Sequence, residues 1–444
     1  MARPRSPGRR PAQGDSELAL TWVVLATIAL LSAVAPLATD MYLPVFPQVA
    51  AEFATSASTV QLTLTLFMVG MGIGQLLWGP ISDRWGRRAP LLCAGILFIA
   101  ASVVAPLSPS IGVLVATRFV QGFTGSAGMV IGRAVTRDLA HGVALARAMS
   151  LLGIIGALAP IVAPIAGGLL AAPIGWRGIL WVIAGISVLM LACSTFLLRE
   201  SLPPAGRRAG GVRDTARSVA AVLSDRRFVG YSLTQAFGGG VLFAFISGSS
   251  FVLQNEYGLS ATHYSWLFAL NALTMIVGGV LNARLVARHS PAQVLSVALV
   301  ISVVATLAAA AVTTALSRPS LWLLLPLVAA ASLCIAPNMA NTTTLGLDRH
   351  GANAGMAAAV MGALQAALSG VVSQMVSITG QASAVSMTLV MAGSAVLAVL
   401  SYLALCRPRP RLQAPVDDDD HHNSGSPEDD SEQNDASRDE PVSP

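Results

Sequence analysis

Charged residues are scarce in this sequence of 444 residues: only 11% are Asp, Glu, Lys or Arg, whereas 54% are hydrophobic. A typical globular domain has about 25% charged residues. A soluble chain of this length could not cover its surface with so few charges. The composition therefore excludes an ordinary soluble protein and predicts an integral membrane protein.

Lysine is absent, because all 27 basic residues are Arg. Since a P-loop needs a Lys to reach the nucleotide phosphates, the chain carries no Walker-type ATPase site, and a Lys Schiff base is excluded as well. The four cysteines fall in or at the end of apolar runs, at Cys93, Cys193, Cys334 and Cys406. This spacing predicts neither a disulfide framework nor a metal site. The apolar runs also contain no H-E-x-x-H and no G-x-S-x-G, which leaves a membrane enzyme as a weakly supported alternative.

Long apolar runs are abundant, and a run of about 20 such residues can cross a bilayer as a helix. The first run is too long for a signal peptide and lacks its cleavage context, so we expect it to be retained. The sequence therefore predicts an all-α polytopic membrane protein of twelve transmembrane helices. The runs lie near residues 19–39, 58–79, 89–107, 111–132, 148–171, 178–198, 228–252, 264–287, 292–315, 320–343, 354–378 and 384–406.

The arginines indicate the orientation. With the N-terminus in the cytoplasm, 24 of the 27 fall in segments on the cytoplasmic side, and only Arg118, Arg177 and Arg318 fall elsewhere. Basic residues collect in cytoplasmic segments of membrane proteins. We therefore expect both termini to be cytoplasmic.

An internal repeat indicates two related halves. The segment from Gly79 to Arg88 lies 200 residues before a similar segment from Gly279 to Arg288, and each joins the second and third helices of its half. Duplicated halves with a substrate site between them are common in secondary transporters. The predicted parts are a disordered cytoplasmic N-terminus (1–17), an N-terminal six-helix bundle (18–198), a cytoplasmic central loop (199–227), a C-terminal six-helix bundle (228–406) and a disordered acidic cytoplasmic tail (407–444).

Two charged residues lie within the predicted membrane core. Arg118 lies about seven residues into its span, and Gln121, Gly122 and Gly125 share its helix face at i+3, i+4 and i+7. A charge at this depth costs at least a few kcal/mol unless it is paired or hydrated. Asp40 is the one acidic residue in a membrane-like stretch. Structural interpretations stay open for both residues: a carboxylate that caps the first helix, and an Arg that binds carbonyls at a helix end.

The segment Gly79-Pro-Ile-Ser-Asp-Arg-Trp-Gly-Arg-Arg88 resembles the G-x-L-x-D-R-x-G-R-K/R loop of the major facilitator superfamily. The resemblance implies a conformational latch that breaks as the two halves rock. In this latch Gly79 would allow close helix approach, Gly86 a tight turn, and Asp83 a pair with Arg or a helix terminus. A basic loop that only fixes the topology is the alternative. The latch residues are Gly79, Asp83, Arg84, Gly86, Arg87 and Arg88.

Further segments narrow the resemblance to the Bcr/CflA drug-efflux family, over about residues 18–406. They are Thr39–Pro47, Arg118–Gly122, Gly125–Ala134, Ala159–Gly168, Gly175–Arg177, Phe243–Leu253 and Gly355–Gln365. The resemblance implies a fourth-helix motif with Gln121 and Gly122, and a fifth-helix antiporter motif with Pro160, Pro164, Gly167 and Gly168. The chain departs from the family where Ala163 replaces a usual Gly, and where Phe245 and Ser250 replace a usual Tyr and Pro.

By this resemblance the chain is expected to be a proton-driven exporter of small amphipathic drugs in the bacterial inner membrane. Asp40 and Arg118 would take part in proton coupling. The expected partners are lipophilic drugs, protons and the bilayer, without a cofactor or nucleic acid, and the chain would function as a monomer. A carrier of an amino acid or another metabolite on the same fold is the alternative. Candidates for the substrate cavity, each of which could equally bond between helices, are Gln61, Gln235, Phe245, Asn271, Asn338, Asn341 and Gln365.

Overall fold

The computed structural model describes residues 21–207, 212–316, 318–348, 350, 354–378 and 380–406. This described part of the chain is helical and contains no strand. The predicted disordered segments 1–17 and 407–444, and residues 208–211 of the central loop, lie outside it.

The first half of the chain contains the helices up to residue 198. They are α1 (Trp22–Asp40), η1 (Leu43–Val45), α2 (Phe46–Glu52), α3 (Ala57–Trp85), α4 (Arg88–Val104), η2 (Ala105–Leu107), α5 (Ile111–Leu139) and α6 (Gly142–Leu197). The segment between the halves contains η3 (Pro204–Gly206) and α7 (Val212–Leu223). The second half contains α8 (Arg226–Phe251), η4 (Val252–Glu256), α9 (Ala261–Val286), α10 (Pro291–Ala315), α11 (Leu321–Leu333), α12 (Ile335–Leu347), α13 (Ala354–Met375), α14 (Ala384–Ser401) and η6 (Tyr402–Cys406).

These helices make twelve passes. Ten helical stretches of the described residues are long and apolar enough to cross a membrane. One of them, α6, has 56 residues and supplies two passes, because Gly175 interrupts it with φ 63° and ψ −174°. The charged α5 adds the twelfth pass with 29 residues. The predicted fold, an all-α membrane protein of twelve helices, is thus confirmed.

Local sequence signals place many helix ends. Ser56 and Ser260 cap α3 and α9 by accepting backbone N–H groups, and these two caps lie at equivalent places in the two halves. Ser290 and Ser383 form capping boxes at the starts of α10 and α14. Pro44 has no N–H for the carbonyl of Asp40, which agrees with the end of α1 at Asp40.

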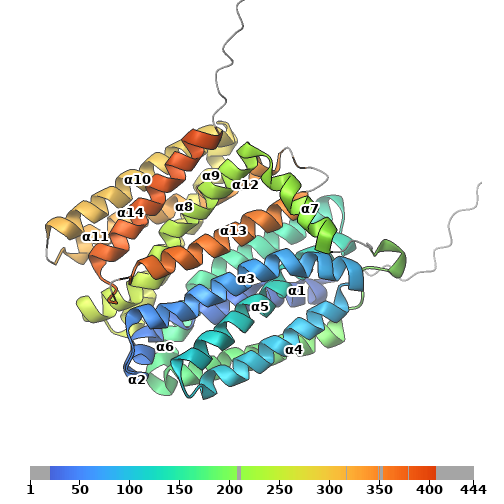
Figure 1. Ribbon diagram of the computed structural model, residues 1–444, viewed down its shortest axis with the longest axis horizontal. Coiled ribbons are helices and arrows are strands. Elements are labelled where there is room, and N and C mark those ends of the chain that lie inside the picture. The colour runs from blue at the N-terminus through green and yellow to red at the C-terminus, as the bar shows by residue number, and fades with distance from the viewer. Residues whose placement is uncertain are drawn as a thin grey trace, which may run out of the picture. The chain divides into compact units, whose positions relative to one another are not determined.

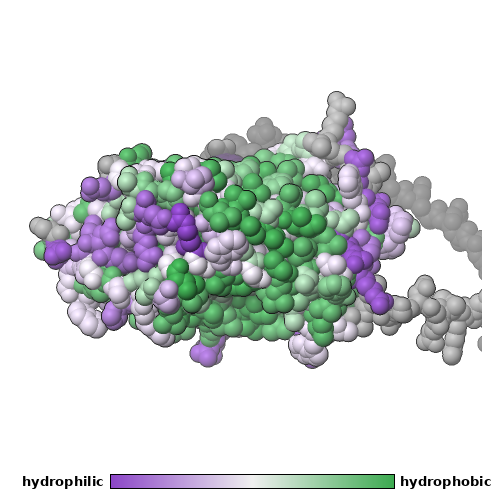
Figure 2. All heavy atoms as spheres, turned by 90° about the horizontal axis from the view of Figure 1, so that it is seen from below, coloured by the Kyte–Doolittle hydropathy of each residue, from purple (hydrophilic) through white to green (hydrophobic). Residues whose placement is uncertain are grey.

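The bundle has two ends, which we name by their acidic residues. The Asp40 end contains the end of α1 and the start of α3, and the Asp83 end contains the end of α3 and the start of α4. Figure 2 shows a broad apolar surface between polar regions at either side of the view, as expected for a chain that crosses a bilayer. The two halves meet where α3 packs against α13 and where α6 packs against α9, and Figure 1 shows α3 beside α13.

Three features differ from the simplest reading of the sequence. The segment between the halves contains the helix α7, whose Val219 and Val222 pack with Phe228 and Met361. The tenth span is divided into α11 and α12 at Cys334. The expected close approach at Gly79 is wrong, since a Cβ there would meet Val130 at an ordinary 3.8 Å. Close approach occurs instead at other glycines of α3, described below.

Candidate functional site

Arg118 lies on α5 and is almost completely buried, with 1% of its surface exposed. Its Nη1 donates to Oε1 of Gln121 at 3.0 Å, and its Nη2 donates to the carbonyl of Ala38 at 2.9 Å. The guanidinium carbon lies 4.3 Å from the centre of the Tyr42 ring and 5.4 Å from that of Phe67. Arg118 forms no ion pair within the described residues. The charge is therefore solvated by an amide, a helix-end carbonyl and two aromatic rings.

The predicted polar face of α5 is present. Gln121 also donates to the hydroxyl of Ser102 at 2.8 Å, which fixes the amide that receives Arg118. A Cβ on Gly122 would lie 1.9 Å from the carbonyl oxygen of Phe67, so only glycine allows α3 and α5 to approach this closely here. The same crowding occurs at Gly70 of α3. The short distance between the two helices holds the Arg118 side chain against α1.

Asp40 is the last residue of α1 and is 7% exposed. Its Oδ1 accepts a hydrogen bond from the Thr39 hydroxyl at 3.1 Å, and it forms no ion pair in the part of the chain that the structure describes. From the second half, the hydroxyl of Tyr264 on α9 is near enough to interact electrostatically with the carboxylate. Arg118 contacts the same helix end through Ala38, but it does not pair with Asp40.

The fifth-helix motif packs around the end of α1. A Cβ on Gly167 would lie 2.2 Å from the carbonyl oxygen of Met41, the residue after Asp40. The neighbouring Gly168 accepts a hydrogen bond from Thr262 of α9 at 3.1 Å through its carbonyl. Pro160 and Pro164 lie within α6. The motif thus provides a surface without side chains where α1, α6 and α9 meet.

The predicted latch residues form a network at the Asp83 end. Arg87 donates to Asp83 at 2.5 Å, to Asp138 at 3.0 Å and to the hydroxyl of Ser82 at 2.8 Å. Burial acts to lower the pKa of the Arg87 guanidinium, but the hydrogen bonds to Asp138 and Asp83 outweigh it and the pKa is raised. The predicted turn is present at Gly86, with φ 93°.

Glu200 belongs to this network, although the sequence analysis does not include it. Its carboxylate accepts the backbone N–H of Arg87 at 2.7 Å and that of Arg88 at 3.2 Å, and so caps the start of α4. The signal in the sequence is an acidic residue directly after the sixth span. Arg84 and Arg88 are exposed, and Arg88 donates to the carbonyl of Thr195 at 2.8 Å. Among the described residues, the hydrogen-bond partners of this loop belong to the first half of the chain or, as Glu200 does, to the segment directly after it.

Several predicted cavity residues bond between helices. In the second half, Gln235 donates to Gln365 at 2.8 Å and accepts from Thr343 at 2.9 Å and from Thr342 at 3.2 Å. The amide of Asn338 packs against Gly238, and its Oδ1 is buried without a hydrogen bond among the described residues. This polar cluster joins α8, α12 and α13 inside the second half.

The remaining candidates lie apart from that cluster. Gln61 donates to the carbonyl of Ser247 at 2.9 Å and accepts from the hydroxyl of Ser377, so it joins the two halves. Phe245 stacks on Phe268 at a ring distance of 5.7 Å, and Asn271 is 9% exposed. Asn341 donates to Asn282 at 2.7 Å. A cavity of about 190 Å³ opens instead near Asp225, Arg227, Phe228, Tyr231, Leu345, Gly346 and Asp348, and it includes none of the predicted cavity residues.

This geometry, with a buried charge in each of two helices and two halves in contact, is that of a membrane carrier. Residues 28–396 match the Major Facilitator Superfamily, and the chain belongs to this family. Solved structures agree in fold: a bacterial homologue of the human lysosomal transporter Spinster, inward-facing and occupied, matches with a TM-score of 0.66 at 17% identity, covering 86% of this chain and 95% of that one. A mutant of the nucleoside transporter NupG matches with a TM-score of 0.68 at 12% identity, covering 86% and 100%. The chain is thus a multi-pass transporter rather than an enzyme.

Relatives at higher identity narrow the class. An uncharacterised MFS-type transporter of Bacillus subtilis (strain 168), YdgK, is 38% identical over 89% of this chain and 97% of its own length. A bicyclomycin resistance protein homolog of Haemophilus influenzae is 31% identical over 87% and 96%. A chloramphenicol resistance protein of Pseudomonas aeruginosa is 34% identical over 61% and 64%. The predicted resemblance to the drug-efflux transporters of the superfamily is confirmed.

Proposed function

We propose that this chain is a proton-coupled antiporter that exports small amphipathic drugs by alternating access. Asp40 would bind and release the proton, and Arg118 would set the local potential and hold the end of α1. One proton that enters down a potential of 100 mV releases about 2.3 kcal/mol, so the transport needs neither ATP nor a cofactor.

The observation that carries this proposal is the presence of two buried charges that form no ion pair among the described residues. Burying a charge in a membrane protein costs several kcal/mol, and intramembrane charges are usually functional. Asp40 is 7% exposed, with one hydrogen bond from a neighbouring side chain, and it lies where the two halves meet. A carboxylate with so few partners can exist in a protonated form without breaking an ion pair.

The arginine distribution supports the orientation. The basic loop at the Asp83 end would lie in the cytoplasm together with both termini, and the Asp40 end would face the outside of the bacterial inner membrane. In the described structure the halves are hydrogen-bonded at the Asp40 end, which corresponds to a carrier closed to the outside. We propose a functional monomer, because each chain contains both halves.

The cargo is proposed from the relatives and from the polar cluster. The relatives are named for resistance to bicyclomycin and chloramphenicol. Gln235, Gln365 and Asn338 offer amide groups inside the second half. A rearrangement of this cluster would supply hydrogen bonds to such a drug as the halves open.

The test is the substitution Asp40→Asn, which keeps the size of the side chain and removes the titratable group. We expect drug binding to be partly retained, while uphill, uncoupler-sensitive efflux from energised vesicles and drug-evoked proton release from purified protein are abolished. Asp214→Asn, which changes an exposed carboxylate on α7, is the matched control and should transport normally. If Asp40→Asn still pumps against a gradient and still releases protons, the proposed coupling site is wrong. Export of an amino acid but of neither drug would favour the metabolite carrier.

A further inference from the structure

The hydrogen bonds between side chains of one half and residues of the other are confined to one end of the described structure. All of them lie towards the Asp40 end, and none lies at the Asp83 end among the described residues. They are Gln61 with Ser247 and Ser377, Thr65 with Gly370, Gln374 with Ser58, Ser250 with Leu43, Gln254 with Pro44, and Thr262 with Gly168. The contact between the halves at this end is therefore made by neutral groups, mostly through backbone carbonyls.

Two of these bonds form a continuous bridge on the segment that follows Asp40. The hydroxyl of Ser250, at the end of α8, donates to the carbonyl of Leu43 at 2.7 Å. The amide of Gln254, one turn later, donates to the carbonyl of Pro44 at 3.0 Å and to the Ser250 hydroxyl at 2.9 Å. Ser250 is completely buried. Two adjacent carbonyls of the first half are thus held by two linked side chains of the second half.

The prolines of this segment change which groups donate to one of these carbonyls. In a continuous α-helix the N–H of residue 47 would bond the carbonyl of residue 43, but residue 47 is a proline and has no N–H. The chain turns here through η1, whose residues contact both α8 and α9. The Leu43 carbonyl accepts the N–H of Phe46 in this turn, and the Ser250 hydroxyl is its second donor.

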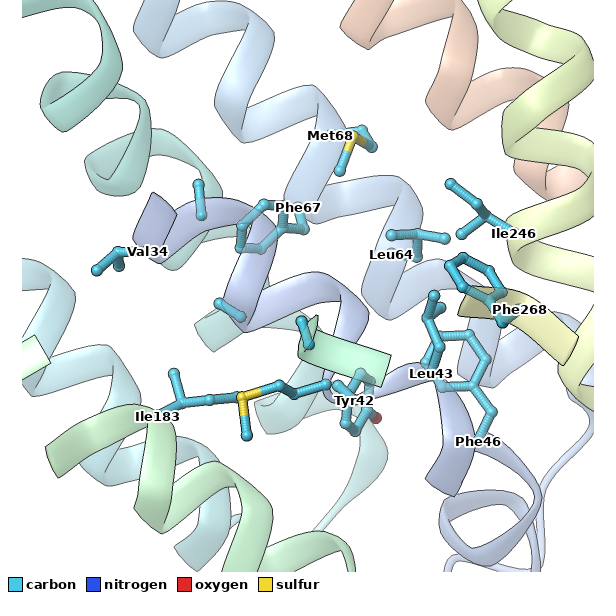
Figure 3. Packing of buried hydrophobic residues seen from close by; sticks show 14 of the residues in the cluster. Val34, Tyr42, Leu43, Phe46, Leu64, Phe67, Met68, Ile183, Ile246 and Phe268 are labelled. Atoms are coloured by element: carbon cyan, nitrogen blue, oxygen red, sulfur yellow. The ribbon is translucent and has the colours of Figure 1, made fainter. Parts of the chain in front are cut away.

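The bridge also lies next to Asp40. Leu43 is three residues after Asp40, and the hydroxyl of Ser249, the neighbour of Ser250, lies 3.3 Å from the hydroxyl of Tyr264 on α9, which interacts electrostatically with the Asp40 carboxylate. Figure 3 shows Leu43 and Phe46 among the same buried side chains as Phe268 of the second half. Opening of the halves at this end has to break the bonds to Leu43 and Pro44, which directly follow the end of α1 at Asp40.

We infer that Ser250 and Gln254 are positioning residues of the coupling site: their bridge to Leu43 and Pro44 keeps the two halves closed at the Asp40 end and keeps the Asp40 carboxylate enclosed. The bridge itself does not depend on the proposed antiport, but its role in transport rests on that proposal. The loss of one net hydrogen bond shifts a two-state equilibrium about two- to tenfold. Such a shift is large enough to measure and small enough to leave the fold intact.

The experiment measures the accessibility of Asp40 and the separation of the halves in purified protein. A water-soluble carbodiimide with an amine labels accessible carboxyl groups, and mass spectrometry gives the rate at Asp40. In parallel, spin labels on cysteines at Ala51 and Gln381, in a background whose four native cysteines are replaced by alanine, report the distance between the halves at the Asp40 end. We expect Ser250→Ala and Gln254→Ala each to raise the labelling rate and the population of longer distances by about two- to tenfold.

The control is Ser247→Ala, on the same helix and equally buried, because among the described residues the Ser247 hydroxyl bonds only within its own helix, to Ala244 at 3.3 Å. This variant should behave as the wild type, and Ser250→Thr should restore the closed state because it keeps the hydroxyl. If neither Ser250→Ala nor Gln254→Ala changes the rate or the distances, the inference is wrong. Since neither readout requires transport, failure of the proposed antiport would appear separately, as wild-type protein that releases no protons with drug.

Discussion

The guanidinium of Arg118 holds α1 and α5 together with donors that point in two directions. Nη1 bonds Gln121 of its own helix, and Nη2 bonds the carbonyl of Ala38. The face of each aromatic neighbour, Tyr42 and Phe67, lies close to the cation. A planar, fixed set of donors suits this arrangement, whereas a Lys ammonium is a compact charge on a flexible stem.

We predict that Arg118→Lys reduces efflux by at least about tenfold although it keeps the charge, because one ammonium cannot reproduce both bonds and both ring contacts. Arg118→Ala should in addition lower the melting temperature in detergent, since it leaves Gln121 and the Ala38 carbonyl without a charged donor, at about 1–3 kcal/mol for each group. Efflux assays and thermal unfolding of the purified variants measure the two effects.

Arg177 provides the matched substitution for this prediction. It pairs with Glu52 and its side chain is 40% exposed, so Arg177→Lys should retain efflux. Normal transport by Arg118→Lys would show that the position requires only a positive charge.

At the scale of helices, the sequence determines most boundaries because their signals are local. Ser caps, capping boxes and Pro44 act within one turn of the helix end that they define. The break at Cys334 has a signal of the same kind, because Pro337 has no N–H for the carbonyl of Leu333, the last residue of α11. The helix α7 has no such signal of comparable strength. The polar face of α5 could be predicted, because its residues follow one another in the sequence at spacings of three and four. The Ala38 carbonyl that binds Arg118 belongs to another helix, so only the tertiary structure shows this contact.

The loop at the Asp83 end also shows that the sequence predicts local features but not contacts between distant segments. Its motif predicts the turn at Gly86 and a pair of Asp83 with an Arg or a helix terminus, and the structure contains this turn and identifies the partner of Asp83 as Arg87. The motif says nothing of Glu200, which lies 113 residues from Arg87 in the sequence and caps α4. It also misplaces the close packing at Gly79, because crowding depends on which helix lies opposite.

We predict that Asp83→Asn slows efflux more than it reduces expression or thermal stability. The Asp83 side chain is 40% exposed and Arg87 keeps Asp138, so the loss of this ion pair costs at most about 1 kcal/mol. A latch that forms when the Asp83 end closes would nevertheless need the carboxylate. The measurements are the efflux rate per purified protein and the melting temperature, with Asp214→Asn as control. A normal rate would mean that the loop only fixes the topology.

At the scale of the whole molecule, the two ends of the bundle differ in the interactions that each can form between the two halves. The Asp40 end joins the halves through neutral hydrogen bonds to carbonyls, such as those of Ser250 and Gln61. In the described structure the loop at the Asp83 end forms its ion pairs within the first half, and it forms further hydrogen bonds with Glu200, directly after that half. Opening the Asp40 end therefore breaks neutral bonds, and closing the Asp83 end would bring a charged network towards the second half.

The last prediction is the orientation of these ends in the membrane. Because 24 of the 27 arginines fall on the side of the Asp83 end and the termini, tags at the N-terminus, within residues 205–212 and at the C-terminus should all be cytoplasmic. In a background without native cysteines, a membrane-impermeant maleimide added to intact cells should label cysteines at Ala51 and Gln381, which are exposed at the Asp40 end. It should label a cysteine at the exposed Arg84 only after the cells are permeabilised. Labelling of any tag or of the Arg84 position from outside would reverse the assignment, and would place Asp40 on the cytoplasmic side, where it could not take up a proton from outside to drive export.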